Sequence, residues 1–240
     1  MSTSAMINDW FGAARTGWRA LVVLVLLAAV SSFITTAWLA NSRGSIFSGV
    51  VFGLAMACGL AIAKTLPSAS SGFLLISASL IAYYIAYFAA FGAQLALADF
   101  GLLTQAENWN MGSGGAASPI ALLVGGLVGG FLLSLAFLVI VTPPNNGRSK
   151  LRRALVWSLG SAALAVLGWA LSPILGPVFS PFVRAVRPGE AWLEDPRFNI
   201  GEGPIGMVSS VHFVWQTGMA FAMALVAQRA NSGANKRGTT

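Results

Sequence analysis

The sequence predicts an all-α polytopic membrane protein with six transmembrane helices and a short interfacial helix at its N-terminal end. Two observations support this prediction. Only 9% of the 240 residues are charged and 56% are hydrophobic, whereas a soluble domain has about 25% charged residues. The apolar residues also gather in runs of about 20 residues, the helix length that crosses a bilayer core about 30 Å thick. The runs lack the polar–apolar alternation of a membrane β-barrel.

The apolar runs and the segments around them define the predicted organisation of the chain. Segment 1–19 has apolar residues at helical spacing with charges between them, which predicts a short interfacial helix. The transmembrane domain covers 20–228, and the polar segment 229–240 predicts a disordered cytoplasmic tail. The predicted transmembrane helices are 20–40, 46–63, 72–98, 119–141, 154–178 and 204–227.

The end of the fifth run carries three prolines at intervals of four residues. Pro173, Pro177 and Pro181 lie in the stretch LSPILGPVFSPFV. Proline removes a backbone donor and its ring clashes with the preceding helical turn. We therefore expect this helix to have a kinked or broken end that lies in the membrane interface.

Most cations flank the apolar runs and fall on one side of the membrane when both termini are placed together. Because cytoplasmic loops are enriched in Lys and Arg, that side is predicted to be the cytoplasm, with the protein in the bacterial inner (plasma) membrane. The net charge of +7 is assigned to topology and to contacts with anionic lipids, and no nucleic-acid partner is predicted. Ten of the fourteen cations lie on the cytoplasmic side: Arg15, Arg19, Lys64, Arg148, Lys150, Arg152, Arg153, Arg229, Lys236 and Arg237.

The single cysteine, Cys58, excludes an internal disulfide and a metal site built from several cysteines. Its neighbours, GLAMACGLAIA, are apolar, so the thiol is expected to be packed inside the protein as a small hydrophobic group. No metal and no cofactor are predicted.

Small residues recur at helical spacing in three of the runs, including the five glycines Gly49, Gly53, Gly125, Gly129 and Gly218. Small residues let helix backbones approach closely in a membrane. Two interpretations stay open, namely packing between helices of this chain and docking of another membrane subunit or of a second copy.

The third run holds all three tyrosines, and Tyr83 and Tyr87 are four residues apart and share a helix face. Gln94 lies two turns beyond Tyr87, roughly on that side. These side chains are expected either to form interhelical hydrogen bonds or to line a substrate cavity. No Asp, Glu, Lys or Arg lies centrally in any run, which argues against ion-coupled transport.

His212 is the only histidine and lies in the outer half of the sixth run, with Gln216 one turn deeper on the same face and Trp215 expected near the outer boundary. Three roles are considered for it. It could be a boundary residue bonded to a carbonyl or to water, an axial haem ligand, or the base of a serine–histidine dyad.

The dyad would use Ser113 or Ser118, in the stretch NMGSGGAASPIALL that opens the fourth run. This arrangement resembles the rhomboid intramembrane proteases, six-helix proteins with a serine at the start of the fourth helix and a histidine in the sixth. The resemblance covers these two places in the chain and implies a serine hydrolase. Met111 and Ala116 stand where that family has a glycine two residues before its serine.

The sequence therefore favours an integral membrane protein without an evident catalytic site. A subunit of a membrane complex and a small transport component are the two forms of this prediction. The alternative is a rhomboid-like serine hydrolase that uses Ser113 or Ser118 with His212.

Overall fold

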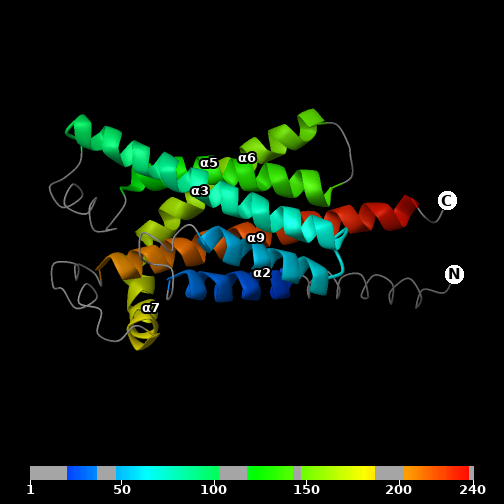
Figure 1. Cartoon of the computed structure of the whole chain (residues 1–240), viewed down its shortest axis with the longest axis horizontal. Coiled ribbons are helices and arrows are strands. Elements are labelled where there is room, and N and C mark those ends of the chain that lie inside the picture. Colours follow the sequence, from blue (N-terminus) through cyan, green and yellow to red (C-terminus); the bar gives the residue numbers. More distant parts are fainter. Residues whose placement is uncertain (1–20, 37–46, 103–117, 143–146, 187–202, 238–240) are drawn as a thin grey trace.

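The computed structural model describes residues 21–36, 47–102, 118–142, 147–186 and 203–237. Every regular element in these ranges is a helix, which confirms the all-α class for this part of the chain. The helices are a first helix, Leu21–Thr36, followed by α2 (Ser48–Ile62), α3 (Ala69–Asp99), α5 (Pro119–Val141), α6 (Gly147–Ala170), α7 (Ser172–Val186) and α9 (Gly203–Arg237). They form an elongated bundle with α7 lying across it (Figure 1).

Four stretches are long and apolar enough to cross a membrane: α3, α5, α6 and Ser209–Ala227 within α9. The first helix and α2 are also apolar but shorter, with α2 only 15 residues long. A helix of that length rises about 22 Å, less than the bilayer core. These four long apolar helices are compatible with a multi-pass membrane protein, and the count of six spans stays a prediction.

The N-terminal ends of α3 and α5 are fixed by serine caps. The Ser68 hydroxyl accepts a hydrogen bond from the Ser71 amide at 3.1 Å, and the Ser118 hydroxyl accepts one from the Ala121 amide at 3.1 Å. Pro119 follows Ser118 in the first helical turn, where its missing N–H costs nothing. Helix α5 therefore has the predicted bounds, whereas α3 begins three residues before the predicted start.

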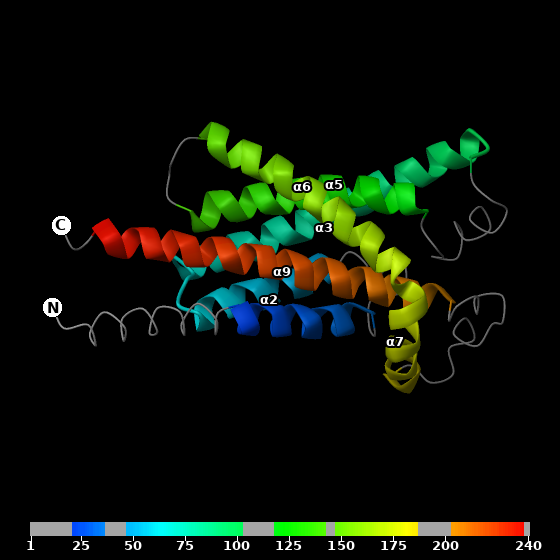
Figure 2. The same cartoon turned by 180° about the vertical axis from the view of Figure 1, so that it is seen from behind.

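The predicted break in the fifth run is confirmed. Helix α6 ends at Ala170, and α7 begins at Ser172 after a turn at Leu171. Figures 1 and 2 show α7 running across the long direction of the bundle, at the end where α9 begins. Pro177 and Pro181 lie inside α7.

The glycines of the small-residue stripes lie against neighbouring helices. A Cβ atom added at Gly49 would lie 2.6 Å from the Ser79 carbonyl oxygen, and one at Gly53 would lie 2.8 Å from the Ile76 Cα. Gly125 and Gly129 of α5 meet Ala90 and Ala86 of α3 at 3.0 and 2.7 Å in the same way, and Gly218 of α9 meets Leu164 of α6 at 2.6 Å. These glycines therefore serve close contacts within the chain.

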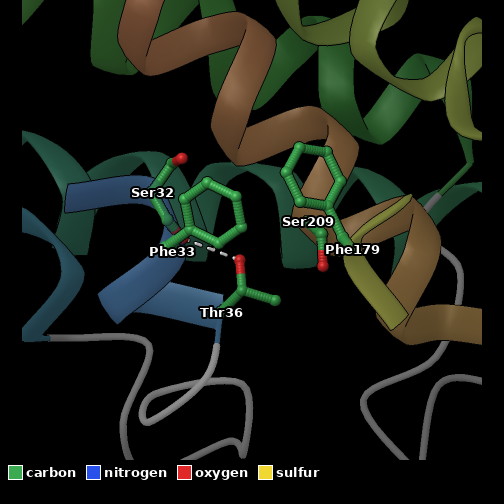
Figure 3. A pocket seen from close by; sticks show the side chains of 5 residues that line it. All are labelled: Ser32, Phe33, Thr36, Phe179 and Ser209. Atoms are coloured by element: carbon green, nitrogen blue, oxygen red, sulfur yellow. Dashed lines mark hydrogen bonds between the residues drawn. The ribbon is translucent and has the colours of Figure 1, made fainter. Parts of the chain in front are cut away.

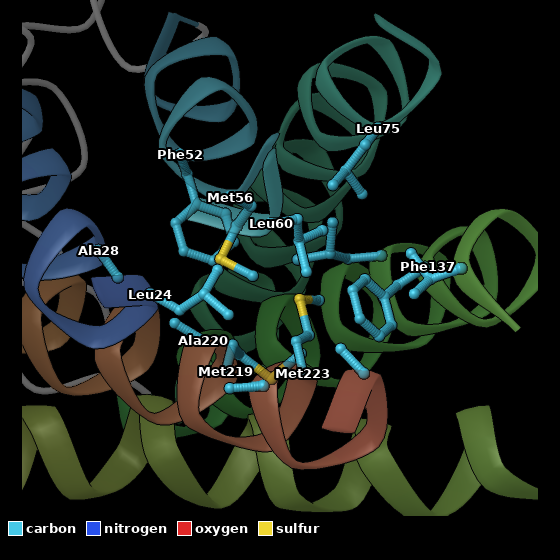
Figure 4. Packing of buried hydrophobic residues seen from close by; sticks show 14 of the residues in the cluster. Leu24, Ala28, Phe52, Met56, Leu60, Leu75, Phe137, Met219, Ala220 and Met223 are labelled. Atoms are coloured by element: carbon cyan, nitrogen blue, oxygen red, sulfur yellow. The ribbon is translucent and has the colours of Figure 1, made fainter. Parts of the chain in front are cut away.

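The apolar core lies where the first helix, α2, α3, α5 and α9 meet. Figure 4 shows Leu24 and Phe52 packed beside the sulfur-containing side chains of Met56, Met219 and Met223. Methionine is flexible and polarizable, so it fills the irregular space between helices of different tilt. Most of the largest fully buried side chains of the described residues belong to this core, and Gln216 and Thr35 are the polar ones among them.

Two expectations differ from the structure. Cys58 is exposed on α2 rather than packed inside, because an apolar sequence neighbourhood is as suitable for a lipid-facing position as for the core. Helix α9 continues to Arg237, so the structure has helix over residues where the sequence suggests a disordered tail.

Candidate functional site

A polar cluster lies inside the bundle around Gln216 of α9. The Gln216 side chain is fully buried. Its Nε2 donates a hydrogen bond to the Tyr83 hydroxyl of α3 at 2.9 Å and a longer one to Thr35 Oγ1 of the first helix at 3.4 Å. One amide thus joins three helices that are far apart in the sequence.

Aromatic rings surround this cluster. The Trp215 ring meets Tyr83 edge-on with centroids 5.2 Å apart, and Phe52 of α2 lies 5.7 Å from Trp215 and 6.2 Å from Tyr83. Trp215 Nε1 donates to Ser161 Oγ of α6 at 2.6 Å. Trp215 is buried, so it belongs to the core rather than to the predicted boundary belt, because Ser161 supplies the partner that its N–H needs.

His212 lies one turn before Gln216 on α9 and is half-buried. Its ring is parallel to that of Tyr83 within 5°, with centroids 6.3 Å apart. The structure therefore places His212 at the edge of the aromatic cluster, next to the tyrosine that Gln216 binds.

Five buried polar atoms, one of them in the Gln216 side chain, have no hydrogen-bond partner among the described residues. They are Gln216 Oε1 and the hydroxyls of Ser31, Ser48, Ser79 and Ser134. An unpaired polar group costs free energy in an apolar interior, so such groups call for an explanation, for example a missing ligand or water. Each of these five atoms comes from a different helix.

Packing contacts bring the unpaired atoms to similar depth in the bundle. Ser31 and Ser79 lie one turn before Thr35 and Tyr83, the two partners of Gln216. Ser48 precedes Gly49, which touches the Ser79 carbonyl. Helix α5 runs antiparallel to α3, since Gly125 meets Ala90 and Gly129 meets Ala86. Continuing that register by five residues places Ser134 opposite Ile81, about 3 Å along the helix from Ser79. We call Thr35, Tyr83, Gln216 and the four unpaired serines the polar layer.

The first helix contributes four buried hydroxyls that the sequence analysis did not single out. Ser31, Ser32, Thr35 and Thr36 are each no more than 2% exposed. Ser32 Oγ donates to the Ala29 carbonyl at 2.7 Å and Thr36 Oγ1 to the Ser32 carbonyl at 2.8 Å. The signal was the stretch SSFITT, which places two adjacent pairs of hydroxyls four residues apart in an otherwise apolar run.

A shallow crevice, too narrow to admit a water molecule, lies between the first helix, α7 and α9. Figure 3 shows its lining residues, Ser32, Phe33, Thr36, Phe179 and Ser209. The rings of Phe33 and Phe179 meet edge-on with centroids 5.1 Å apart. Phe179 also packs against Phe213 of α9 at 5.2 Å, so α7 is held to both neighbouring helices by aromatic contacts.

The structure separates the other residues of the predicted cavity from Gln216. Tyr87 is 43% exposed on the outside of α3. Gln94 is buried, but its Oε1 accepts a hydrogen bond from the Ser118 amide at 3.0 Å. Of the residues proposed for this wall, Tyr83 alone meets Gln216 directly, and Tyr87 and Gln94 do not line a common cavity with it.

The described residues do not form the predicted dyad. Ser118 caps α5 and contacts Gln94, whereas His212 stacks on Tyr83. Eleven residues of α3 separate Tyr83 from Gln94, which corresponds to about 16 Å along the helix. Ser113 lies outside the described residues, so its relation to His212 stays a prediction.

No group of three His, Cys, Asp or Glu side chains that could hold a metal ion occurs in the part of the chain that the structure describes. Compared with protein-family models, with curated proteins and with solved structures, the chain has no match.

Proposed function

We propose that the chain is a six-span protein of the bacterial inner membrane, with both termini in the cytoplasm, and that it is a small transport component for uncharged polar solutes. The predicted spans 20–40 and 46–63, of which the first helix and α2 are the described parts, supply the two additional spans. The sorting of cations supports this orientation. So does the placement of the described chain ends, since the first helix begins and α9 ends at the same end of the bundle (Figure 1).

The observation that supports transport is the polar layer. Lipid-facing and core-facing positions in this chain are apolar alike, yet the bundle interior holds a fully buried glutamine with unpaired hydroxyls around it. Polar residues within membrane spans are costly and commonly mark substrate pathways. The layer contains no carboxylate, ammonium or guanidinium group, which favours an uncharged solute over an ion.

Flux through reconstituted vesicles tests this function. Vesicles that contain the purified protein should swell faster than protein-free vesicles in urea, acetamide or glycerol. They should show no acceleration in sodium acetate, because the layer offers no charge to replace the hydration of an ion. Swelling equal to that of protein-free vesicles in all three neutral solutes would contradict the proposal.

A second candidate function is supported by a different surface. Four aromatic side chains of α3 are exposed next to one another, namely Tyr84, Tyr87, Phe88 and Phe91. The tyrosine hydroxyls would lack partners against lipid tails, which favours contact with another membrane subunit. Purification from native membranes in mild detergent tests this candidate, since a subunit should co-elute with a stoichiometric partner. Recovery as a lone monomer would contradict it.

A further inference from the structure

We infer that the polar layer is a binding site for a small neutral molecule that both donates and accepts hydrogen bonds, with Gln216 as its central recognition group. This inference rests on the proposed transport function and names the chemistry of the solute. Primary amides are the class that fits best, because they carry a donor and an acceptor on one small group.

The hydrogen-bonding capacity of the Gln216 amide is not fully used within the protein. In the orientation described, Nε2 is bonded to Tyr83 and Thr35, and Oε1 has no partner. In the flipped orientation Oε1 would accept from these two hydroxyls, and Nε2 would be unpaired. One end of the amide is therefore unsatisfied in either orientation, and a ligand with both donor and acceptor groups can pair with it.

Unpaired hydroxyls lie at a similar depth in the bundle on the two helices that bind Gln216. Ser31 and Ser79 lie within about one turn of the atoms that bind Gln216, on the two helices that supply its partners. Serine hydroxyls donate and accept equally well. A guest held by Gln216 would thus find further partners on the first helix and on α3.

The polar layer has no charged side chain and is bordered by aromatic rings. Beside the polar layer stand the rings of Phe52, Tyr83 and Trp215, which are packed against one another. An ion would have to leave its hydration shell for neutral hydroxyls and ring faces, whereas a neutral amide loses far less on transfer. The site therefore discriminates against acetate, the charged molecule that has nearly the shape of acetamide.

The buried hydroxyls of the first helix lie toward two places, the crevice and the polar layer. Ser32 and Thr36 line the crevice beneath α7, and the preceding residues, Ser31 and Thr35, face the polar layer. Because Gln216 is fully buried, a ligand can reach it only when helices move apart. The contact between Phe33 of the first helix and Phe179 of α7 lies next to these hydroxyls and would have to open.

Thermal unfolding of the purified protein in detergent tests the site. Acetamide should raise the Tm saturably, since a ligand that binds only the folded state stabilises it by mass action. Acetate at equal concentration should not. The variant Gln216→Met keeps the length of the side chain and should lose the acetamide shift. The matched control is Thr217→Val, whose hydroxyl bonds only to carbonyls of its own helix, and it should keep the shift.

A second variant keeps the test informative if Gln216→Met does not fold. Ser31→Ala removes one unpaired hydroxyl and should raise the half-saturating acetamide concentration about two- to tenfold. The inference is overturned if acetamide gives no saturable shift in the unaltered protein, or if Gln216→Met shifts as much as Thr217→Val. If acetamide binds but no flux through vesicles is found, transport is refuted and the binding site stands. If Gln216→Met still transports acetamide, with the same dependence of flux on acetamide concentration, the binding site is refuted and transport stands.

Discussion

At the scale of single residues, the contact between Gln216 and Tyr83 joins two positions 133 residues apart in the chain. Interhelical hydrogen bonds in membranes contribute modestly, about 0.6 kcal/mol on average. The amide of Gln216 also carries an unpaired end. The proposed binding role would account for a buried amide whose hydrogen bonds contribute so little to stability.

A double-mutant cycle measures this balance. We expect Tyr83→Phe and Gln216→Met to show a coupling free energy of about 0.5–1 kcal/mol in reversible unfolding in detergent. Gln216→Met alone should lower stability by no more than about 2 kcal/mol, because removal of the unpaired Oε1 offsets part of the cost of leaving the Tyr83 hydroxyl without its partner. A loss of several kcal/mol in that single variant would show that Gln216 is chiefly structural.

A matched pair of glycine substitutions tests the packing of α2 on α3. Gly49→Ala would place a methyl group 2.6 Å from a backbone oxygen and should destabilise the protein by about 1–3 kcal/mol. Gly92→Ala, in a part of α3 with no atom within 4 Å of the added carbon, should be neutral or stabilising by up to about 1 kcal/mol. Equal effects of the two substitutions on the unfolding free energy would contradict the close approach of these helices.

The limits of sequence reasoning are clearest at this scale. Tyr83 and Tyr87 share a helix face, yet one meets Gln216 and the other is exposed. In water, polarity separates the inner face of a helix from its outer face, but lipid tails are as apolar as the core. The same ambiguity explains why Cys58 was expected inside and lies outside.

At the scale of elements, local chain chemistry was sufficient to predict several helix ends. The Ser118–Pro119 pair identifies the start of α5, and Pro173 identifies the break between α6 and α7, because caps and prolines act within one turn. The direction that α7 takes after the break depends on aromatic contacts with Phe33 and Phe213, which no local pattern reveals.

The orientation of α7 gives a prediction for spin labels. Ile174, Val178 and Phe182 are exposed along α7, which runs across the bundle (Figure 2). Labels at these three positions should lie at nearly equal depth in the bilayer, near the interface, as measured by collisional relaxation with oxygen and a polar reagent.

The control uses α3, which runs along the bundle. Labels at the exposed positions Leu74, Ile81 and Phe88 should change in depth by about 10 Å per step of seven residues. A comparable gradient along α7 would show that α7 crosses the membrane instead of lying in its surface.

At the scale of the whole molecule, four long helices and two short ones are combined in one bundle. The first helix and α2 are too short to span the bilayer core alone over their described lengths. Helix α7 lies across the bundle beside the first helix and contacts it through Phe33. The short helices can carry polar side chains at their ends because these side chains are buried against longer helices instead of facing lipid. Thr35, near the end of the first helix, contacts α9, and Ser48, at the start of α2, lies next to α3.

The membrane topology is tested most directly by a reporter that is active only outside the cytoplasm. Fused after Arg148, at the start of α6, it should be inactive, and inserted after Gly101, at the end of α3, it should be active. This result is predicted because an even number of spans precedes Arg148 and an odd number precedes Gly101. The six-span arrangement on which the transport proposal depends would be contradicted by an active reporter at Arg148. It would also be contradicted if the reporter were active at both positions or inactive at both.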